Sequence, residues 1–285
     1  MSQSARTEAA DAPATLADKE ATLREALAGC GSVIVAYSGG ADSAYLAYVS
    51  HEVLGDKALC VTAESPSYPR RHRELALRVV RQLHLNHRFI ETHEMDRPDY
   101  RANPANRCYF CKQELYEVLG RLAREGGYAA IVDGNNADDR GDYRPGRQAA
   151  REAGVRSPLD EADLSKEEIR YLSRAAGLPT WDQPASACLS SRIPYLSEVT
   201  NEKLQMIERA EMVLQDLGFR ICRVRHHGDT ARLEMDPNDM ARAVEPGTRA
   251  TILSELRALG FRYVTVDLQG YRSGSLNEGL RLRAV

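Results

Sequence analysis

Short apolar stretches alternate with longer amphipathic stretches along the first half of the chain. The apolar stretches are rich in β-branched residues, as buried parallel strands are, and they occupy residues 32–37, 57–64, 87–94 and 128–139, the last with a polar exit. Apolar positions recur with helical spacing in residues 16–28, 44–54, 70–85 and 111–127. This alternation predicts an α/β fold built on a doubly wound parallel sheet with right-handed crossovers. Ligands of such sheets bind beyond the C-terminal ends of the strands.

The pattern changes after Gly177. Residues 178–199 contain three prolines and predict an ordered loop, as residues 96–107 predict a polar loop. A helix from Asn201 to Leu217, two strands, two short helices and a final strand then predict a small α+β unit. We therefore divide the chain into a larger α/β domain that includes the 184–192 loop and a smaller domain for substrate binding or oligomerisation, with the boundaries 1–18 (disordered tail), 19–196 and 197–285.

Composition narrows the class of protein. The 285 residues are 43% hydrophobic and 28% charged, which is typical of a globular protein. A net charge of −3 argues against a general nucleic-acid binder, and we expect no nucleic-acid partner. No apolar run has membrane-spanning length and the start of the chain carries no apolar signal region, so a cytoplasmic location without membrane contact is expected. Six cysteines then indicate thiol chemistry or metal binding more than a disulfide framework.

The first strand runs directly into the segment SGGADS, residues 38–43. Gly39 and Gly40 leave room for a ligand against the backbone, and the following helix N-terminus attracts an anion. Ser38 and Ser43 add hydroxyl groups, while Asp42 suits a bound Mg²⁺ or an oriented donor. The loop is not a Walker A loop, because no Gly-Lys-Ser/Thr follows. It resembles the PP-loop of the ATP pyrophosphatases, the adenine nucleotide alpha hydrolase-like fold, and the alternative is an ordinary glycine turn.

A second candidate site contains three cysteines. Cys108 and Cys111 lie at the start of a helix, where their spacing places both sulfurs on one side. Such a pair alone fits half a zinc site, a redox pair or two packed thiols. Cys188 lies in a loop of small residues with Arg192 four positions on, a setting for a reactive thiolate, with a buried thiol as the alternative. Arg192 is also expected to contact the substrate. Three thiolates suit a [4Fe–4S] cluster that leaves one iron open. The other cysteines fit core positions: Cys30, Cys60 and Cys222.

Acidic and basic residues suggest further contacts with ligands. The turn DGNNADD (133–139) follows the fourth strand, so Asp133, Asn135 and Asp138 are expected beside the nucleotide, with a helix-capping turn as the alternative. Arg223 and Arg225 alternate along a strand and could hold a phosphate together. An ion-pair ladder with residues such as Glu234 is the alternative. Three more arginines could meet a phosphate or lie on solvated helix faces: Arg140, Arg144 and Arg147.

Two aromatic features carry less weight. Adjacent strand residues face opposite ways, which argues against joint metal binding by His226 and His227. Trp181 could stack on a flat ring or belong to the core.

Most of the chain resembles the LarE family of ATP-dependent sulfur transferases, which serve biosynthesis of a nickel-pincer cofactor. The matching segments are residues 38–43, RCYFCK (107–112), 133–139, DYRPGRQAA (142–150), VRSPL (155–159), SKEEIR (165–170) and PASACLSSRIPY (184–195). The resemblance implies that ATP adenylates a carboxylate of pyridinium-3,5-biscarboxylic acid mononucleotide and that sulfur then displaces AMP. It implies that arginines of the RVR segment bind the substrate phosphate and that a downstream nickel-inserting protein receives the product.

The family has two variants. In one, a single cysteine gives up its sulfur and becomes dehydroalanine. In the other, two additional cysteines are thought to hold a [4Fe–4S] cluster that carries an extra sulfide. The resemblance of Cys108, Cys111 and Cys188 is to the second variant, and sacrifice of the Cys188 sulfur is the alternative.

Other functions fit parts of the sequence. A tRNA-thiolating PP-loop enzyme shares the loop and a three-cysteine set, but it needs a basic face that the net charge does not suggest. An amidating synthetase needs a glutaminase partner and no cysteine triad. A non-enzymatic iron–sulfur carrier leaves residues 38–43 unexplained. We expect a homo-oligomeric enzyme.

Overall fold

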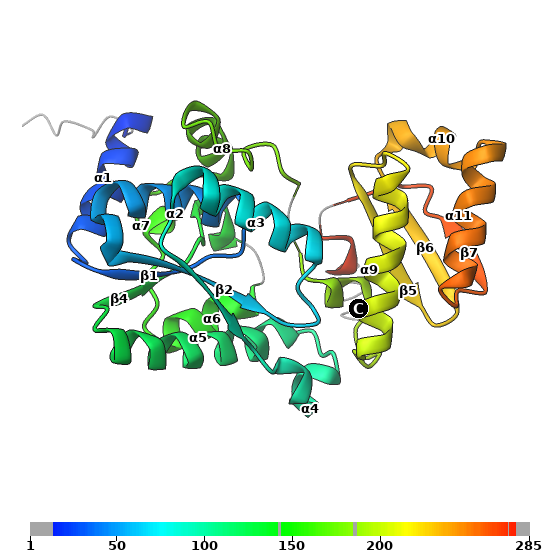
Figure 1. Ribbon diagram of the computed structural model, residues 1–285, viewed down its shortest axis with the longest axis horizontal. Coiled ribbons are helices and arrows are strands. Elements are labelled where there is room, and N and C mark those ends of the chain that lie inside the picture. Colours follow the sequence, from blue (N-terminus) through cyan, green and yellow to red (C-terminus); the bar gives the residue numbers. More distant parts are fainter. Residues whose placement is uncertain (1–13, 142–143, 185–186, 273, 278–285) are drawn as a thin grey trace, which may run out of the picture.

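The computed structural model describes residues 14–141, 144–184, 187–272 and 274–277, and it contains two separate sheets (Figure 1). The larger sheet is parallel, with strand order β3-β2-β1-β4. Its strands are β1 (Val33–Ala36), β2 (Ala58–Glu64), β3 (His87–Glu91) and β4 (Ala130–Val132). The predicted α/β class and the four predicted strands are confirmed. All four strands end at one edge, so the turns that follow β1 and β4 are neighbours.

Helices cover both faces of this sheet, because successive strand residues point to opposite sides. Val33 and Val35 pack in one core, whereas Ile34 and Ala36 pack in another. The first core is closed by α1 (Leu16–Ala28), α2 (Ala41–Leu54), α3 (Arg70–Leu83), α7 (Pro158–Glu161) and α8 (Lys166–Ala175). The second is closed by α5 (Arg107–Gly126) and α6 (Pro145–Glu152). The layers are visible in Figure 1, with α5 and α6 on one side of the sheet.

The C-terminal part forms the predicted small α+β unit around a three-stranded sheet of order β5-β6-β7. Strands β5 (Cys222–His227) and β6 (Thr230–Met235) are antiparallel, and β7 (Tyr263–Val266) runs parallel to β6. A separate apolar core lies between this sheet and α9 (Asn201–Asp216), α10 (Met240–Val244) and α11 (Pro246–Ala258).

A further core joins the two units. Leu189 and Ile193 pack with Tyr100 of α4 (Pro98–Arg101) and with Leu204 and Ile207 of α9. This cluster crosses the predicted boundary at residue 196, and the division at that residue stays a prediction. The contact fixes the Cys188 loop between the large sheet and α9.

The structure corrects three local predictions. Helix α1 spans Leu16–Ala28 as predicted, and the Thr15 side chain caps it in a reciprocal pair with Asp18, so residues 15–18 do not belong to the tail assigned to residues 1–18. Residues 1–13 lie outside the described part. The predicted loop 96–107 contains α4, and α5 begins at Arg107, four residues before its predicted start. No described helix is both long and apolar enough to cross a bilayer.

Candidate active site

Hydrogen bonds between Ser38 and Ser43 hold the two ends of the loop after β1 together. The backbone N–H of Ser38 donates to the Ser43 Oγ at 3.2 Å, and the two hydroxyl oxygens lie 3.0 Å apart. The Ser43 hydroxyl also donates to the Gly40 carbonyl at 3.1 Å. Gly40 is the N-cap of α2 and makes no side-chain capping bond. The first N–H groups of α2 therefore face the end of the strand without a protein cap, which suits a phosphate.

Two glycines allow other elements to approach this loop closely. Gly39 has φ +77°, and a Cβ there would lie 2.8 Å from the Cβ of Ala76 on α3. A Cβ on Gly134, in the turn after β4, would lie 3.0 Å from the backbone nitrogen of Ser43. Larger residues would force the loop apart at both positions. Gly134 was not among the predicted site residues, although it lies within the 133–139 motif.

Asp42 lies in the first turn of α2 within a group of charges. Burial and the nearby Asp139 raise the pKa of the Asp42 carboxyl to about 6. Asp139 is itself buried and pairs with Arg144 at 3.1 Å and with Lys166 at 2.9 Å. A divalent cation would relieve the repulsion between the two carboxylates. The donor set at Asp42 therefore fits the Mg²⁺ that accompanies ATP.

Asp42→Asn is expected to stabilise the protein in the absence of nucleotide and Mg²⁺ at pH 8. The folded state holds the Asp42 proton more tightly than the unfolded chain, so this contribution to stability is lost as the pH rises from about 4 to about 6. Removing the ionised carboxyl should raise the melting temperature at pH 8 by a few degrees, and the gain should shrink at pH 5. The exposed Asp56, at the far end of α2, gives the control Asp56→Asn. An unchanged or lower melting temperature at pH 8 would show that Asp42 is not strained by its surroundings.

The other predicted acidic residues are occupied in protein contacts. Asp133 accepts hydrogen bonds from Tyr116 at 2.8 Å, Ser157 at 2.7 Å and Asn135 at 2.6 Å. Asp138 accepts a hydrogen bond from the backbone N–H of Lys166 at 2.7 Å, at the start of α8. The bond from Lys166 favours the capping alternative for Asp138, whereas Asp133 is held by side chains, and direct contacts of Asp133, Asn135 and Asp138 with ATP stay a prediction.

The structure brings the three predicted cysteines to one place. Cys108 and Cys111 lie in the first turns of α5, and Cys188 immediately precedes the short turn Leu189–Arg192. Burial, then Glu94 and Cys188, raise the pKa of the Cys111 thiol well above its usual value. Cys108 is exposed, whereas Cys111 and Cys188 are partly buried. Burial and Cys188 raise the pKa of the Cys108 thiol, and Arg107 opposes them.

Arg107 is a site residue that the sequence analysis did not single out. Its side chain is buried, donates to the Ser190 carbonyl at 2.9 Å and bonds the side chain of Asn103. Cys188 and Cys108 both raise the pKa of Arg107 against the effect of burial. The guanidinium therefore lies beside both thiols and would stabilise anionic sulfur. Its position directly before the Cys-x-x-Cys segment was the available signal.

The cysteine set fits an iron–sulfur cluster by its chemistry. The described residues contain no group of three or more His, Cys, Asp and Glu side chains that could hold a single metal ion. A [4Fe–4S] cluster does not require such convergence, because each thiolate binds a different iron. Three neighbouring thiols beside a buried arginine meet that requirement.

Arg192 holds the Cys188 loop from inside. It is 1% exposed and donates two parallel hydrogen bonds to Glu211 of α9, at 2.8 and 3.0 Å. Its Nη1 group donates to the carbonyls of Ala187 at 2.8 Å and Cys188 at 2.9 Å and to the Ser191 hydroxyl at 2.9 Å. The guanidinium is thus used within the protein. This geometry favours a positioning role for Arg192, and its contact with the substrate stays a prediction.

Arg223 and Arg225 differ in their surroundings. Arg225 is buried and binds Glu234 through two bonds, at 2.9 and 2.7 Å, together with the Ser191 carbonyl at 2.6 Å. The ion-pair alternative therefore describes Arg225. Arg223 lies with its guanidinium 5.2 Å from the ring centre of Tyr271. Burial and Arg192 lower the pKa of Arg223, so an anion bound beside it would be favoured.

The remaining predicted residues have local partners. Arg140 and Arg147 pair with Asp160, each through side-chain nitrogens, at 2.5 and 2.6 Å. Trp181 is partly exposed, with the Arg174 guanidinium 4.9 Å from its ring centre. Cys60 and Cys222 are buried as predicted, Cys30 is partly buried, and His226 is buried whereas His227 is exposed. Residues 142–143 and 185–186 of the matching segments lie outside the described part.

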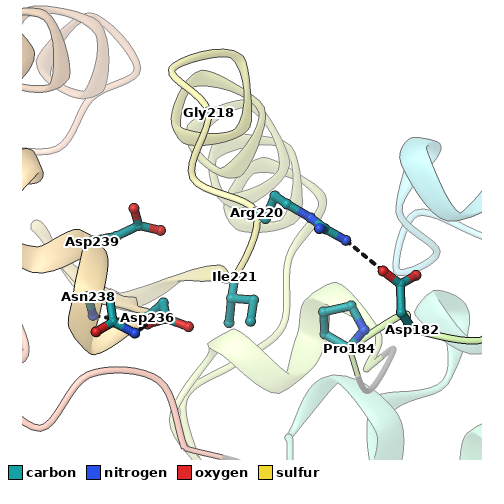
Figure 2. Close-up of a pocket in the computed structure, with 8 residues that line it drawn as sticks. All are labelled: Asp182, Pro184, Gly218, Arg220, Ile221, Asp236, Asn238 and Asp239. Carbon is teal, nitrogen blue, oxygen red and sulfur yellow. Dashed lines mark hydrogen bonds and ion pairs between the residues drawn. The ribbon is translucent and has the colours of Figure 1, made fainter.

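A separate cavity of about 520 Å³ lies between the loop that precedes Cys188 and the small unit. Figure 2 shows Arg220 reaching Asp182, at 3.0 Å, along one wall, with Asp236 and Asp239 on another. Its lining is acidic and includes none of the predicted site residues. The cavity therefore does not belong to the candidate active site.

Comparisons with known proteins show which proteins this chain is similar to. No protein-family model matches the chain. It is 45% identical over 265 residues to an uncharacterised protein of Synechocystis, covering 93% of this chain and 99% of the relative. It is 37% identical over 268 residues to the pyridinium-3,5-bisthiocarboxylic acid mononucleotide synthase of Lactiplantibacillus plantarum, covering 94% and 96%. One component of the glutamine-hydrolysing GMP synthase of Methanopyrus kandleri matches at 28% identity over 207 residues, covering 64% and 62%.

Proposed function

The chain belongs to the LarE family of PP-loop enzymes, and on that basis we propose that it is an ATP-dependent sulfur transferase acting on pyridinium-3,5-biscarboxylic acid mononucleotide. It would convert a carboxylate of this small molecule to a thiocarboxylate during synthesis of the nickel-pincer cofactor. We also propose that the protein is a cytoplasmic homo-oligomer and that it passes its product to a nickel-inserting protein.

One observation carries this function. The segment Ser67–Tyr68 forms hydrogen bonds both to the loop of residues 38–43, the phosphate loop, and to the loop that carries Cys188. The Tyr68 hydroxyl donates to the Ser38 carbonyl at 3.0 Å. One residue earlier, the Ser67 carbonyl accepts a hydrogen bond from the backbone N–H of Leu189 at 2.8 Å. Cys188 is thereby held close to the loop that would bind pyrophosphate. Adenylation takes place on an oxygen of the carboxylate and sulfur attack on its carbon, so both steps need the same carboxyl group and these two loops must be neighbours.

The phosphate loop supports the first half of the reaction. A carboxylate is a poor electrophile, whereas an acyl-adenylate has AMP as a good leaving group. The carboxylate oxygen attacks the α-phosphorus of ATP, and pyrophosphate leaves toward Ser38, Ser43 and the N–H groups at the start of α2. Asp42 would hold the Mg²⁺ that neutralises the phosphates.

The cysteine set supports the second half. We propose that Cys108, Cys111 and Cys188 hold a [4Fe–4S] cluster, which when bound supplies an iron with an open position for the sulfur to be transferred. Arg107 balances the negative charge of the thiolates, and Arg192 fixes the backbone on which Cys188 is carried. Sulfur then forms a bond to the acyl carbon as the bond to AMP breaks. Sacrifice of the Cys188 sulfur is the alternative.

The direct test uses the purified protein under anaerobic conditions with ATP, Mg²⁺ and the mononucleotide. AMP and pyrophosphate should form only when all three are present. Mass spectrometry should show a product in which one oxygen atom has been replaced by sulfur. Formation of an amide, or of AMP without the mononucleotide, would contradict the proposed function.

Arg223→Ala should weaken binding of the mononucleotide by about 1.5–3 kcal/mol, the range for a hydrogen bond to a charged group, and leave ATP affinity nearly unchanged. Arg225→Ala should instead lower the free energy of unfolding by roughly 3 kcal/mol, because it leaves the buried Glu234 without its main partner. Arg232 still reaches Glu234 at 2.8 Å, which limits this loss. Calorimetric titration and urea unfolding measure the two effects. If Arg223→Ala weakened ATP binding by the same amount, Arg223 would not belong to a site that binds the mononucleotide alone.

A further inference from the structure

The turn formed by residues 65–68, between β2 and α3, makes the contacts that connect the two loops of the candidate site. The Tyr68 hydroxyl donates to the Ser38 carbonyl of the phosphate loop at 3.0 Å. The Ser67 carbonyl accepts the backbone N–H of Leu189, the residue that follows Cys188, at 2.8 Å. The position of this turn therefore sets how the Cys188 loop lies relative to the phosphate loop.

Glu94 holds this turn from a separate element. It lies after β3, at the start of the short helical turn Glu94–Asp96, and its side chain is buried, with the residue 2% exposed. Its Oε1 atom accepts a hydrogen bond from the Ser67 hydroxyl at 2.9 Å. The Ser67 hydroxyl also lies 3.0 Å from that of Ser65, within the turn itself. Glu94 thus connects the 65–68 turn to the end of the neighbouring strand.

The neighbours of Glu94 in the chain contact the start of α5 and the Cys188 loop. The backbone N–H of the residue before it donates to the Glu114 side chain of α5. Met95, the residue after it, packs on the same apolar core as Cys111 and Leu189. Glu94 therefore lies where the helix that carries Cys111, the 65–68 turn and the Cys188 loop meet.

The second carboxylate oxygen of Glu94 indicates that stability alone does not account for this residue. Its Oε2 atom is buried and has no hydrogen-bond partner among the residues that the structure describes. A buried carboxylate that is bonded at one oxygen only is unfavourable for folding. The bond to Ser67 is the contact through which Glu94 can act on the site.

We propose that Glu94 is a positioning residue for sulfur transfer, which fixes the 65–68 turn through the Ser67 hydroxyl and so keeps the Cys188 loop beside the phosphate loop. The inference rests on the proposed function, in which sulfur must reach an acyl-adenylate before water hydrolyses it. Because reacting atoms must lie about 3–3.5 Å apart, a small displacement of the Cys188 loop slows the transfer. Loss of the bond should therefore impair sulfur transfer more than adenylation.

The two half-reactions are measured together in the anaerobically reconstituted protein with ATP, Mg²⁺, the mononucleotide and sulfide. The ratio of thiocarboxylate to pyrophosphate should fall roughly tenfold in Ser67→Ala and in Glu94→Leu, in keeping with the loss of one hydrogen bond. The double variant should fall no further, because both substitutions remove the same bond. Glu94→Gln should keep most of the parent ratio, because its amide oxygen can still accept the Ser67 hydroxyl.

Alkylation of the metal-free protein gives a second readout that does not depend on activity. Iodoacetamide should modify Cys188 several-fold faster in Ser67→Ala and in Glu94→Leu than in the parent protein, because the loop is held less firmly. Cys222 is buried in β5 and reports general unfolding, so its rate should not change. Mass spectrometry of the peptides measures both rates in the same sample.

Both readouts must change in Ser67→Ala, with the Cys222 rate unchanged, for the proposal to stand. An equal fall of pyrophosphate and thiocarboxylate would overturn it. A loss in Glu94→Gln as large as that in Glu94→Leu would also overturn it, because the effect would then come from the charge and not from the bond. If the parent protein forms no thiocarboxylate, the proposed function fails, whereas the alkylation rates still test the role of Glu94.

Discussion

Asp42→Asn is expected to lower the ATP-dependent formation of pyrophosphate by at least about 100-fold, the loss typical of removing one group that stabilises charge in a transition state. The carboxyl at this position lies at the start of α2, beside Asp139, where a Mg²⁺ ion bound to ATP would sit. An amide has nearly the same shape but no charge to offer the metal. Pyrophosphate release in the presence of the mononucleotide measures the effect.

The melting temperature of Asp42→Asn separates a loss of activity from a loss of folding. Asp42→Asn should melt at a higher temperature than the parent protein at pH 8, so a loss of activity cannot be assigned to unfolding. Asp56→Asn, at the other end of the same helix, should keep the parent rate. If Asp42→Asn releases pyrophosphate at the parent rate, the assignment of the SGGADS segment as a pyrophosphate-binding loop is wrong.

Replacing any one of Cys108, Cys111 or Cys188 by alanine is expected to remove colour, bound iron and sulfur transfer together after anaerobic reconstitution with iron and sulfide. The reason is that the three thiols lie in one place and would share one cluster. Alanine at Cys60, which is buried in β2, is the matched control and should keep iron and activity. Visible absorption, iron content and thiocarboxylate formation are measured on the same samples.

The sacrificial mechanism gives the opposite results. If the sulfur comes from Cys188 itself, Cys108→Ala and Cys111→Ala should stay active. The intact protein should then become about 34 Da lighter after one turnover, because the elimination leaves dehydroalanine. With a cluster, the protein mass should not change and added sulfide should support several turnovers. Dehydroalanine at position 188 after a single round with ATP and substrate would rule out the cluster mechanism.

The order of elements could be predicted from sequence because it depends on local spacing. Buried parallel strands and amphipathic helices leave distinct periods, so β1, α2 and the loop between them were located from residues 33–54 alone. The neighbouring positions of residues 38–43 and 133–139 followed from topology, since parallel strands end at one edge. Gly134 against Ser43 shows how close these two turns are.

The carboxylate partners that the arginines bind in the folded protein could not be predicted in the same way. Spacing places Arg223 and Arg225 on one side of a strand, but it does not reveal whether a guanidinium already has a carboxylate partner. Glu234 binds Arg225 and Glu211 binds Arg192 through tertiary contacts between separate elements. Arg107 was missed for a related reason, because only the fold brings Ser190 and Cys188 to its side chain.

Arg192 holds the path of its loop through the backbone, independently of the Cys188 side chain. Its hydrogen bonds go to the carbonyls of Ala187 and Cys188, not to the sulfur, so the path of the backbone does not depend on what the Cys188 side chain becomes. If Cys188 gave up its sulfur, the loop should therefore keep its path, so the two proposed sources of sulfur place the same demand on this backbone.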